Sequence, residues 1–325
     1  MLIVRTTNTD IFWNLAVEEY LLGLVDRHPQ ILFLWQSRDA VVIGKNQIPW
    51  RECRMKLLME DDVPMGRRVS GGGAVFHDMG NLNYTLVTRR GNYSSAWTFQ
   101  TVLDALKNLG IEARVQGRSL MADGRKFSGN AFCFRGDAAL HHGTMLISSD
   151  LDQLNRYLEP SESVIRSRAI RSVPSLVVNL QELRPDVTVE RVASALLEAF
   201  QSAYGDVKEF VTDGFQNNKA VTALYRKQMS WEWQFGNTPP FDIEMQGEFE
   251  WGMVRARLFI QRGAIVDAAV VIEGRNEAFG PVIEERLTGS TLEPDELFSH
   301  LKTLPPDCDE RIAVNLAEWI LSAGA

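Results

Sequence analysis

The sequence predicts an α/β (α+β) protein built from two domains. Its 325 residues suit two domains of about 150 residues each, or one large domain with an appendage. Strand-like and helical patterns alternate up to about residue 240, and three consecutive strand patterns followed by helices come after it. We therefore expect one domain over residues 1–240 and a smaller one over 241–325.

The first helix is expected over residues 10–25, where Thr9 or Asp10 can cap its N-terminus. Four apolar residues fall on one of its faces at helical spacing: Phe12, Leu15, Ala16 and Leu22. Two short apolar runs follow at 31–35 and 40–44, and the polar residues between them predict a hairpin. A helix over about 51–60 ends before Pro64.

Strands predominate in the next part of the chain. Glycine turns separate three expected strands, at 67–70, 73–77 and 81–88. A helix over 95–109 ends at Gly110, and further strands are expected at 111–115, 125–134 and 140–148. The segment 159–176 contains Pro160, Pro174, five serines and three arginines, so we expect a long functional or mobile loop.

The remaining elements follow from the same two periodicities. Helices are expected at about 189–203 and 217–228. The second domain should contain strands at 241–249, 253–260 and 264–272, followed by helices near 294–302 and 309–322.

The composition is that of an ordinary globular protein, with 45% hydrophobic and 23% charged residues. No apolar run approaches the roughly 20 residues that span a bilayer, so no membrane segment is expected. The net charge of -8 argues against nucleic acid as a partner, because binding requires clustered Lys and Arg. Three widely spaced cysteines and an N-terminus without a leader pattern favour a cytoplasmic location.

The most informative stretch is Arg67-Arg68-Val69-Ser70-Gly71-Gly72-Gly73-Ala74-Val75-Phe76-His77-Asp78. Consecutive glycines are costly in entropy, so we expect positive φ angles or a close approach to the backbone. Backbone N–H groups in such a turn, preceded by two arginines, can bind a phosphate or a carboxylate. The alternative is a glycine-rich hairpin with surface arginines. The stretch is not a Walker loop, since no Gly-Lys-Ser/Thr follows.

A second candidate is Lys126, within Gly124-Arg125-Lys126-Phe127-Ser128-Gly129-Asn130-Ala131. Because side chains alternate along a strand, Lys126, Ser128 and Asn130 should face the same way. A lysine on the inner face of a sheet is costly unless a ligand anion neutralises it. The other interpretation is an exposed lysine on an edge strand, and the residues alone favour neither.

The histidines do not predict a metal site. His141 and His142 should face opposite sides of a strand, so one structural and one solvent-facing imidazole are expected. His77 beside Asp78 has no third ligand at a suitable spacing. We therefore assign no metal ligand to the protein.

Taken in order, these stretches resemble the lipoate–protein ligase family of the bacterial two-domain type, with relatives among biotin ligases and octanoyltransferases. The resemblance covers essentially the whole chain. It rests on Trp35, Val42-Ile43-Gly44-Lys45-Asn46-Gln47, the stretch from Arg67 to Asn81, Arg125 to Ala131, His141 to Thr144, Ser167-Arg168, Val178-Asn179-Leu180 and Ser230-Trp231-Glu232-Trp233.

The resemblance implies a mixed-sheet, biotin/lipoate ligase-like catalytic domain and a small C-terminal α/β accessory domain. It implies that Lys126 is the catalytic residue, placed between the lipoate carboxylate and the α-phosphate of ATP. The loop from Pro160 to Leu180 would close over the adenylate. The implied binding residues are Trp35, Arg67, Arg68, Ser70, Gly72, Gly73, Ala74, Val75, Phe76, His77, Lys126, Ser128, His142 and Asn179.

The implied reaction adenylates lipoate with ATP and Mg²⁺ and then transfers the lipoyl group to a lysine. The implied acceptors are the lipoyl domains of 2-oxoacid dehydrogenase acyltransferase subunits and the glycine cleavage H protein. One departure from the family pattern is Gly117-Arg118-Ser119-Leu120, where the family has Gly-Arg-Asn-Asp. Asp123 could replace the missing carboxylate only if its loop folds back. Two alternatives are a lipoyl or octanoyl transferase that uses a preformed acyl adenylate, and a non-catalytic lipoate-binding protein.

Overall fold

The computed structural model describes residues 1–158, 164–207, 209–273, 277–302 and 310–322. Its contacts divide the chain into two compact units. Unit 1 comprises Met1–Gly44, Gly66–Leu154 and Val173–Met229, and unit 2 comprises Lys45–Met65, Asn155–Ser172 and Ser230–Ala325. Three stretches of the expected first domain, 45–65, 155–172 and 230–240, thus belong to unit 2, and the domain boundary near residue 240 stays a prediction.

Unit 1 is built on a mixed sheet that, in the described part of the chain, has eight strands. Parallel pairing joins β1 to β12 and to β2, and the other pairs are antiparallel. The predicted mixed α/β class is therefore confirmed. The spatial order is β12 (Glu209–Thr212), β1 (Leu2–Arg5), β2 (Gln30–Trp35), β6 (Asn81–Arg89), β10 (Ala138–Leu146), β9 (Arg125–Arg135), β8 (Ser119–Ala122) and β7 (Arg114–Gln116).

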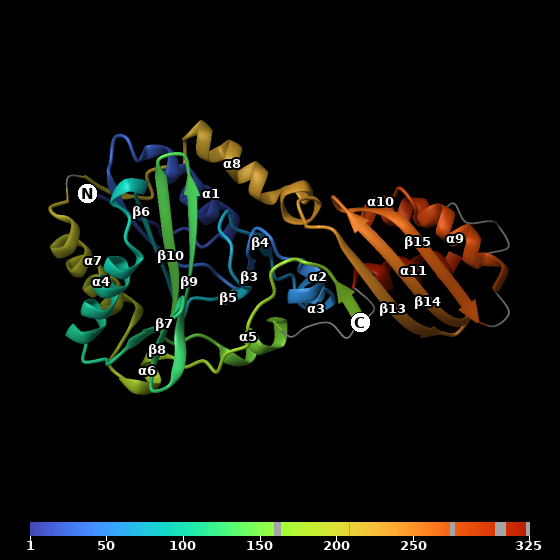
Figure 1. Cartoon of the computed structure of the whole chain (residues 1–325), viewed down its shortest axis with the longest axis horizontal. Helices are drawn as coiled ribbons and strands as arrows, with labels where there is room; N and C mark the ends of the chain where they lie inside the picture. Colours follow the sequence, from blue (N-terminus) through green and yellow to red (C-terminus); the bar gives the residue numbers. More distant parts are fainter. Residues whose placement is uncertain (159–163, 208, 274–276, 303–309, 323–325) are drawn as a thin grey trace. The chain divides into compact units, whose positions relative to one another are not determined.

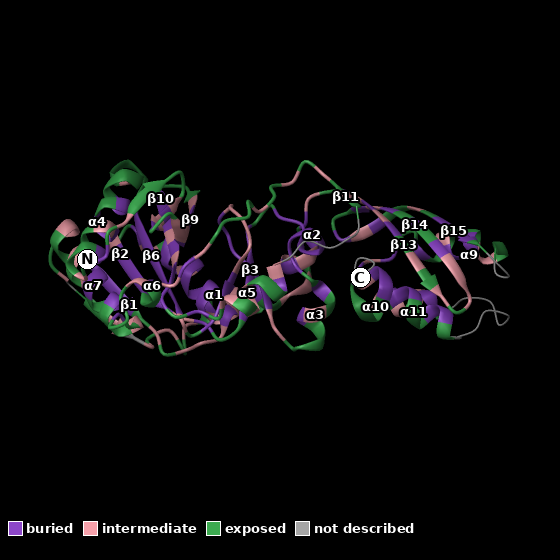
Figure 2. Cartoon of the chain, turned by 90° about the horizontal axis from the view of Figure 1, so that it is seen from below, coloured by how far each residue is buried: buried purple, intermediate pink, exposed green. Residues whose placement is uncertain are grey.

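Two long helices of unit 1, α4 (Ser95–Asn108) and α7 (Val189–Tyr204), pack side by side against one face of this sheet (Figure 1). Their side chains and those of the strands form one buried core, which includes Tyr84, Phe127 and Phe200. Figure 2 shows the central strands β2 and β6 buried along their length. The face that α4 and α7 cover is therefore closed by packing, and the site lies on the other face.

The other helices of unit 1 are shorter. The helix α1 (Ile11–Leu21) begins at Asp10, whose carboxylate accepts hydrogen bonds from two backbone N–H groups, as predicted for a cap. It packs against α8 (Lys219–Met229). The one-turn helix α6 (Leu180–Leu183) follows Asn179, and α5 (Leu151–Leu158) runs across the division between the units.

A separate small sheet carries the glycine-rich stretch. Its order is β4 (Met65–Arg67), β3 (Ala40–Ile43) and β5 (Val75–His77). Since β2 pairs with β1 and β6 instead of with β3, the predicted hairpin over 31–44 is wrong. The alternative of a glycine-rich hairpin is also wrong, because β4 and β5 flank β3 on opposite sides. Residues 68–74 are not strand and cross over the end of β3.

Unit 2 contains an antiparallel sheet with the order β11 (Val164–Arg166), β13 (Phe241–Phe249), β14 (Gly252–Gln261) and β15 (Ala264–Glu273). The three strands predicted after residue 240 are confirmed. The expected helix at 51–60 is divided into α2 (Pro49–Glu52) and α3 (Met55–Glu60), because Cys53 is extended. The other helices are α9 (Gly280–Leu287), α10 (Pro294–Leu301) and α11 (Glu310–Leu321), with one π-helical turn at Glu232–Gly236.

The segment 159–176, expected to be one long loop, contains a short strand. Residues 159–163, including Pro160, lie outside the described residues, while β11 follows at once and pairs with β13. Among the helices that the structure describes, none combines the length and the apolarity that a membrane crossing requires.

Candidate functional site

The glycine-rich stretch has both properties that its sequence predicts. Gly72 has a φ of +92°, which side-chain-bearing residues rarely adopt. The carbonyl oxygen of Gly72 also approaches Gly44 at the end of β3, where a Cβ would lie only 2.5 Å from it. Glycine at both positions therefore lets residues 68–74, here called the glycine loop, pass directly over β3.

Arg67, just before the loop, and Arg68, its first residue, hold the loop in place. The guanidinium of Arg68 donates hydrogen bonds to the carbonyl oxygens of Gly71 and Gly73, at 2.7 and 2.6 Å, and to that of Val42 at 3.1 Å. Arg67 is fully buried and donates to the carbonyl of Gly44. Burial lowers the pKa of Arg68 to about 10. Direct binding of a phosphate or an acyl group by these arginines stays a prediction.

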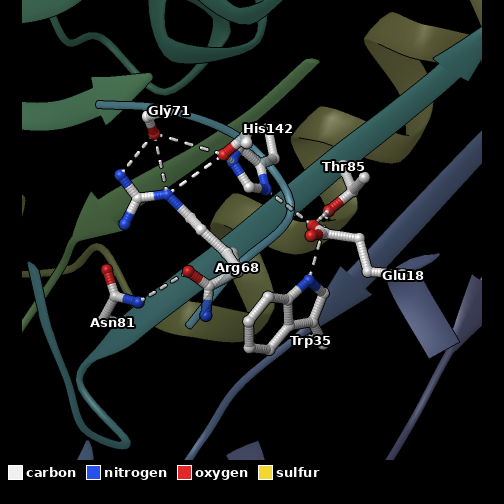
Figure 3. Close-up of polar contacts among 9 residues, drawn as sticks. Glu18, Trp35, Arg68, Gly71, Asn81, Thr85 and His142 are labelled. Atoms are coloured by element: carbon white, nitrogen blue, oxygen red, sulfur yellow. Dashed lines mark hydrogen bonds and ion pairs between the residues drawn. The ribbon is translucent and has the colours of Figure 1, made fainter. Parts of the chain in front are cut away.

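A continuous set of hydrogen bonds connects the loop to the sheet and to α1 (Figure 3). The Nε of Arg68 donates to the hydroxyl of Ser70 at 3.1 Å. This hydroxyl lies 2.7 Å from Nε2 of His142 on β10, and Nδ1 of the same ring lies 2.8 Å from Oε1 of Glu18. His142 is therefore held between a hydroxyl and a carboxylate, and the expectation of a solvent-facing imidazole is wrong.

The same carboxylate reaches a buried tryptophan. Oε1 of Glu18 accepts a hydrogen bond from the hydroxyl of Thr85 at 2.6 Å, and Thr85 accepts one from Nε1 of Trp35 at 3.3 Å (Figure 3). The Trp35 ring contacts the His77 ring edge to face, with 5.5 Å between their centroids. Burial, with the positive charge of Arg68 second, lowers the pKa of His77 to about 3. His77 is therefore a neutral wall of the site.

Lys126 lies on the face of the sheet opposite α4 and α7 because strand β9 is irregular. Met121 pairs with Lys126 and Leu120 pairs with Ser128, so Phe127 is an extra residue in β9. As a result Phe127 and Ser128 both face the helix-covered core, and the Lys126 amine lies over Gly129. The prediction that Lys126 and Ser128 face the same way is wrong for this reason.

Asn130 and His141 also lie on the helix-covered side. Asn130 donates to Ser128 and accepts a hydrogen bond of 2.5 Å from Tyr84. His141 contacts the same asparagine and packs edge to face on Phe132, so it is the structural imidazole that the sequence predicts. Any role of Ser128 in binding stays a prediction, and its hydroxyl is buried away from Lys126.

Lys126 is a partly buried cation. Among the described residues, no hydrogen bond or ion pair of its side chain is present. Burial lowers its pKa, and the charge of Arg68 lowers it further. Its backbone is fixed, because its N–H donates to Leu176 at 2.8 Å and its carbonyl accepts from Val178 at 3.0 Å. Residues 176–178, at the end of the expected loop, therefore run beside Lys126.

Asn179 and Asp123 are engaged in local structure. The Asn179 side chain exchanges two hydrogen bonds with the backbone of Ser149 and caps α6, so its predicted role in binding is not visible in these contacts. Asp123 and Gly124 both have positive φ and form the tight turn between β8 and β9. The exposed Asp123 carboxylate pairs with Arg125, so it does not fold back toward the site.

The described residues do not fit a metal held by the protein. No group of three His, Cys, Asp or Glu side chains among them could bind an ion. Leu120, where the resemblance led us to expect a carboxylate, is buried in the core, and Asp123 is paired with Arg125. A divalent cation would have its ligands on the phosphates of a nucleotide, which is the usual way for Mg²⁺ to reach such sites.

Comparison with known proteins agrees with this geometry. Residues 10–201 match the family described as the lipoyl protein ligase A/B catalytic domain. The chain belongs to this family. It is also 32% identical to the lipoate-protein ligase A of Psychrobacter cryohalolentis, over 98% of this chain and 97% of that protein.

Solved structures of lipoate ligases share the fold. The structure of LipL1 from P. falciparum in complex with lipoate has a TM-score of 0.66 and 28% identity, and the match covers 99% of each chain. A lipoate-protein ligase A bound with ATP has a TM-score of 0.58 and 25% identity, over 72% of this chain and 97% of that one. The predicted lipoate–protein ligase fold is therefore confirmed.

The sequence could have revealed one residue of this ligase site that it did not. Glu18 stands three residues after Leu15 and four before Leu22, in the middle of the apolar face of α1. A carboxylate at such a position must be buried and therefore needs a partner. Thr85 carries no comparable signal, since a threonine is common on either face of a strand.

Proposed function

We propose that the chain uses ATP to activate lipoate as lipoyl adenylate and then transfers the lipoyl group to a lysine of an acceptor protein. The proposal rests on Lys126, a partly buried ammonium that has no anionic partner among the described residues and lies on the sheet face beneath the glycine loop. Membership in the lipoyl protein ligase family supports the reaction class.

The first step forms a bond between a lipoate carboxylate oxygen and the α-phosphorus of ATP, and pyrophosphate leaves with the electron pair. In the second step the acceptor amine attacks the lipoyl carbonyl, and AMP leaves. Both steps place negative charge on oxygens that Lys126 would contact. A unit charge at about 4 Å contributes about 4 kcal/mol at an effective dielectric of 20, which equals about a thousandfold in rate.

The glycine loop and the buried wall would bind the two ends of the substrate. Backbone N–H groups at Gly72 and Gly73 can bind phosphate oxygens, because no Cβ blocks an approach to them. Trp35 and His77 form an uncharged surface deeper in the unit, which suits the apolar lipoyl tail. Mg²⁺ would arrive on the phosphates of ATP, and we assign it no ligand in the protein.

We further propose that the acceptors are lipoyl domains of 2-oxoacid dehydrogenase acyltransferase subunits and the glycine cleavage H protein. These domains present one lysine, and a lysine amine is the nucleophile that the second step needs. Gel-shift or mass detection of a lipoylated acceptor, with an acceptor whose lysine is replaced by arginine as the control, would test this part.

The experiment that tests the activation step is pyrophosphate release from ATP and lipoate without acceptor. Lys126→Ala should fold normally and release pyrophosphate at least about a hundredfold more slowly, because the fixed charge is lost. Lys126→Arg is the matched variant that keeps the charge in another shape. Unchanged turnover of Lys126→Ala would contradict the proposal.

The replacement of the family carboxylate by Leu120 favours a second candidate, a transferase that accepts preformed lipoyl adenylate. Synthetic lipoyl adenylate with an acceptor domain distinguishes the two. Transfer from the adenylate, together with an absence of pyrophosphate release from lipoate and ATP, would identify the transferase.

A further inference from the structure

We propose that Glu18 is a positioning residue that holds both the glycine loop and Trp35 in the arrangement that the acyl substrate requires. This inference rests on the proposed function. Two branches of hydrogen bonds meet at Oε1 of Glu18. The loop branch runs through His142 and Ser70 to Arg68, and the tryptophan branch runs through Thr85 to Trp35.

The chemistry of Arg68 and Glu18 fixes the direction of the hydrogen bonds at the two ends of the loop branch. A guanidinium only donates hydrogen bonds and a carboxylate only accepts them. His142 therefore carries a proton on Nδ1, toward Glu18. The hydroxyl of Ser70 lies 2.7 Å from Nε2 of His142 and 3.4 Å from the carbonyl oxygen of Gly71. That hydroxyl keeps its lone pairs for the Nε–H of Arg68.

The tryptophan branch has the same direction. The indole N–H of Trp35 can only donate, so Thr85 accepts it and uses its own proton on Glu18. Both branches thus end on one carboxylate oxygen. Loss of this acceptor would leave the hydroxyl of Thr85 and the imidazole N–H of His142 without their partner at the same time.

Both branches are buried, so the loss of one of their hydrogen bonds is energetically costly. Glu18 and Ser70 are each 1% exposed, and Thr85 is fully buried. A buried donor without an acceptor costs more than the bond contributes. The second oxygen of Glu18, Oε2, is buried and has no hydrogen-bond partner in the described part of the chain. A carboxylate kept there at such a desolvation cost indicates a role in the site instead of in stability.

The next residue provides a matched control. Glu19 is 6% exposed and sits on the same helix, and its carboxylate pairs with Arg135 and Lys227 and accepts from Gln228. None of these partners belongs to either branch. Glu19→Gln therefore removes a buried negative charge from α1 without changing either branch. Glu18→Gln removes the neighbouring negative charge, at which both branches end.

The test uses the full chain and three measurements: the KM and kcat for lipoate in pyrophosphate release, calorimetric binding of lipoate, and amide hydrogen exchange of residues 68–75. Glu18→Gln keeps one oxygen acceptor but removes the charge that strengthens both hydrogen bonds. We therefore expect it to raise the lipoate KM about tenfold, with a smaller effect on kcat, and to speed exchange in the glycine loop. Glu19→Gln should change neither property. Glu18→Asp, which retains a carboxylate, should recover part of the loss.

Two further variants separate the branches. Thr85→Val should weaken lipoate binding while exchange in the glycine loop stays slow. His142→Asn keeps a donor near Glu18 but cannot reach Ser70, so it should speed exchange in the loop. These two variants also test the inference if Glu18→Gln does not fold.

Three results would overturn the inference. They are equal effects of Glu18→Gln and Glu19→Gln, unchanged loop exchange in both Glu18→Gln and His142→Asn, and a covalent lipoyl group on Ser70 in quenched wild-type protein. The last result would make the Ser70–His142–Glu18 set a nucleophilic triad. A wild-type protein that releases no pyrophosphate would contradict the proposed function. The exchange measurement would still test the role of Glu18, because hydrogen exchange does not require turnover.

Discussion

Gly129→Ala is the most direct test of where the Lys126 amine lies. A Cβ added at Gly129 would be 3.2 Å from both Cε and Nζ of Lys126, and 3.9 Å from the hydroxyl of Thr144. The first two distances are shorter than ordinary contacts, and the atoms concerned are the far end of a flexible side chain. Gly129 does not have a positive φ, so alanine introduces no backbone strain there. We therefore expect the amine to move while the strand stays in place.

The size of the effect follows from the charge. At an effective dielectric of 20, moving an ammonium from about 4 Å to about 4.5–5 Å from a unit negative charge costs about 0.5–0.8 kcal/mol. This equals about a two- to fourfold loss in rate for each charged oxygen. In the proposed reaction Lys126 would face charge on both the carboxyl group and the phosphate, so Gly129→Ala should slow pyrophosphate release about four- to sixteenfold. The melting temperature should stay the same or rise slightly, because alanine reduces the entropy of the unfolded chain.

The assay is pyrophosphate release with lipoate and ATP, measured beside thermal unfolding. Gly23→Ala is the control, because a Cβ at Gly23 meets no atom within 4 Å. Wild-type turnover in Gly129→Ala would show that the amine does not lie over this glycine during the reaction. A loss as large as that of Lys126→Ala, or a protein that does not fold, would show that the space cannot be filled even by a shift of the lysine.

Three other predictions concern the same unit. Burial lowers the pKa of Lys126 in the folded protein. At pH values between this lowered pKa and 10.5, the folded protein therefore binds fewer protons than the unfolded chain. The free energy of unfolding should rise with pH in this range. Denaturant titrations should show this rise in the wild type but not in Lys126→Met. Gly44→Ala should cost more than about 1 kcal/mol of stability and raise the lipoate KM, because its Cβ would lie 2.5 Å from the carbonyl oxygen of Gly72; an unchanged melting temperature and KM would refute the close approach. Burial lowers the pKa of His77 and of His141 to about 3, so the unfolded chain binds more protons than the folded one below 6.5. Each histidine should therefore remove up to about 1.4 kcal/mol of stability per pH unit on acidification, and His77→Phe should make this dependence shallower.

The long periodic elements of the fold could be predicted from the sequence, and the short ones could not. The helix at Ser95–Asn108 and the strands at Phe241–Phe249 and Ala138–Leu146 are long enough for their apolar periods to be read. Strand β1, Leu2–Arg5, has only four residues and is defined by its two parallel neighbours, which a single local pattern does not contain. Pairing also decided the failure at residues 31–44, since β2 and β3 join different sheets.

The candidate site also has features that the local sequence predicts and features that it does not. The glycine loop was predictable because consecutive glycines have a local meaning, and Gly72 has the positive φ expected. The sides of the sheet on which Lys126 and Ser128 lie were not predictable, because the extra residue Phe127 reverses the alternation of side chains along β9. No property of that sequence marks the irregularity. It follows from the pairing of β9 with β8, whose Leu120 and Ala122 must both reach the core.

The irregularity explains why Lys126 can be a site residue at all. A regular strand would place it with Ser128 on the helix-covered face, where a charge would meet only core side chains. The shift instead puts it near Arg68, whose positive charge adds to the larger effect of burial in lowering the pKa of Lys126. An anionic substrate between them would gain from both charges and relieve their repulsion. Binding of phosphate and carboxylate therefore recovers free energy that the unliganded fold has already lost, which favours a tightly held adenylate over a tightly held neutral acyl group.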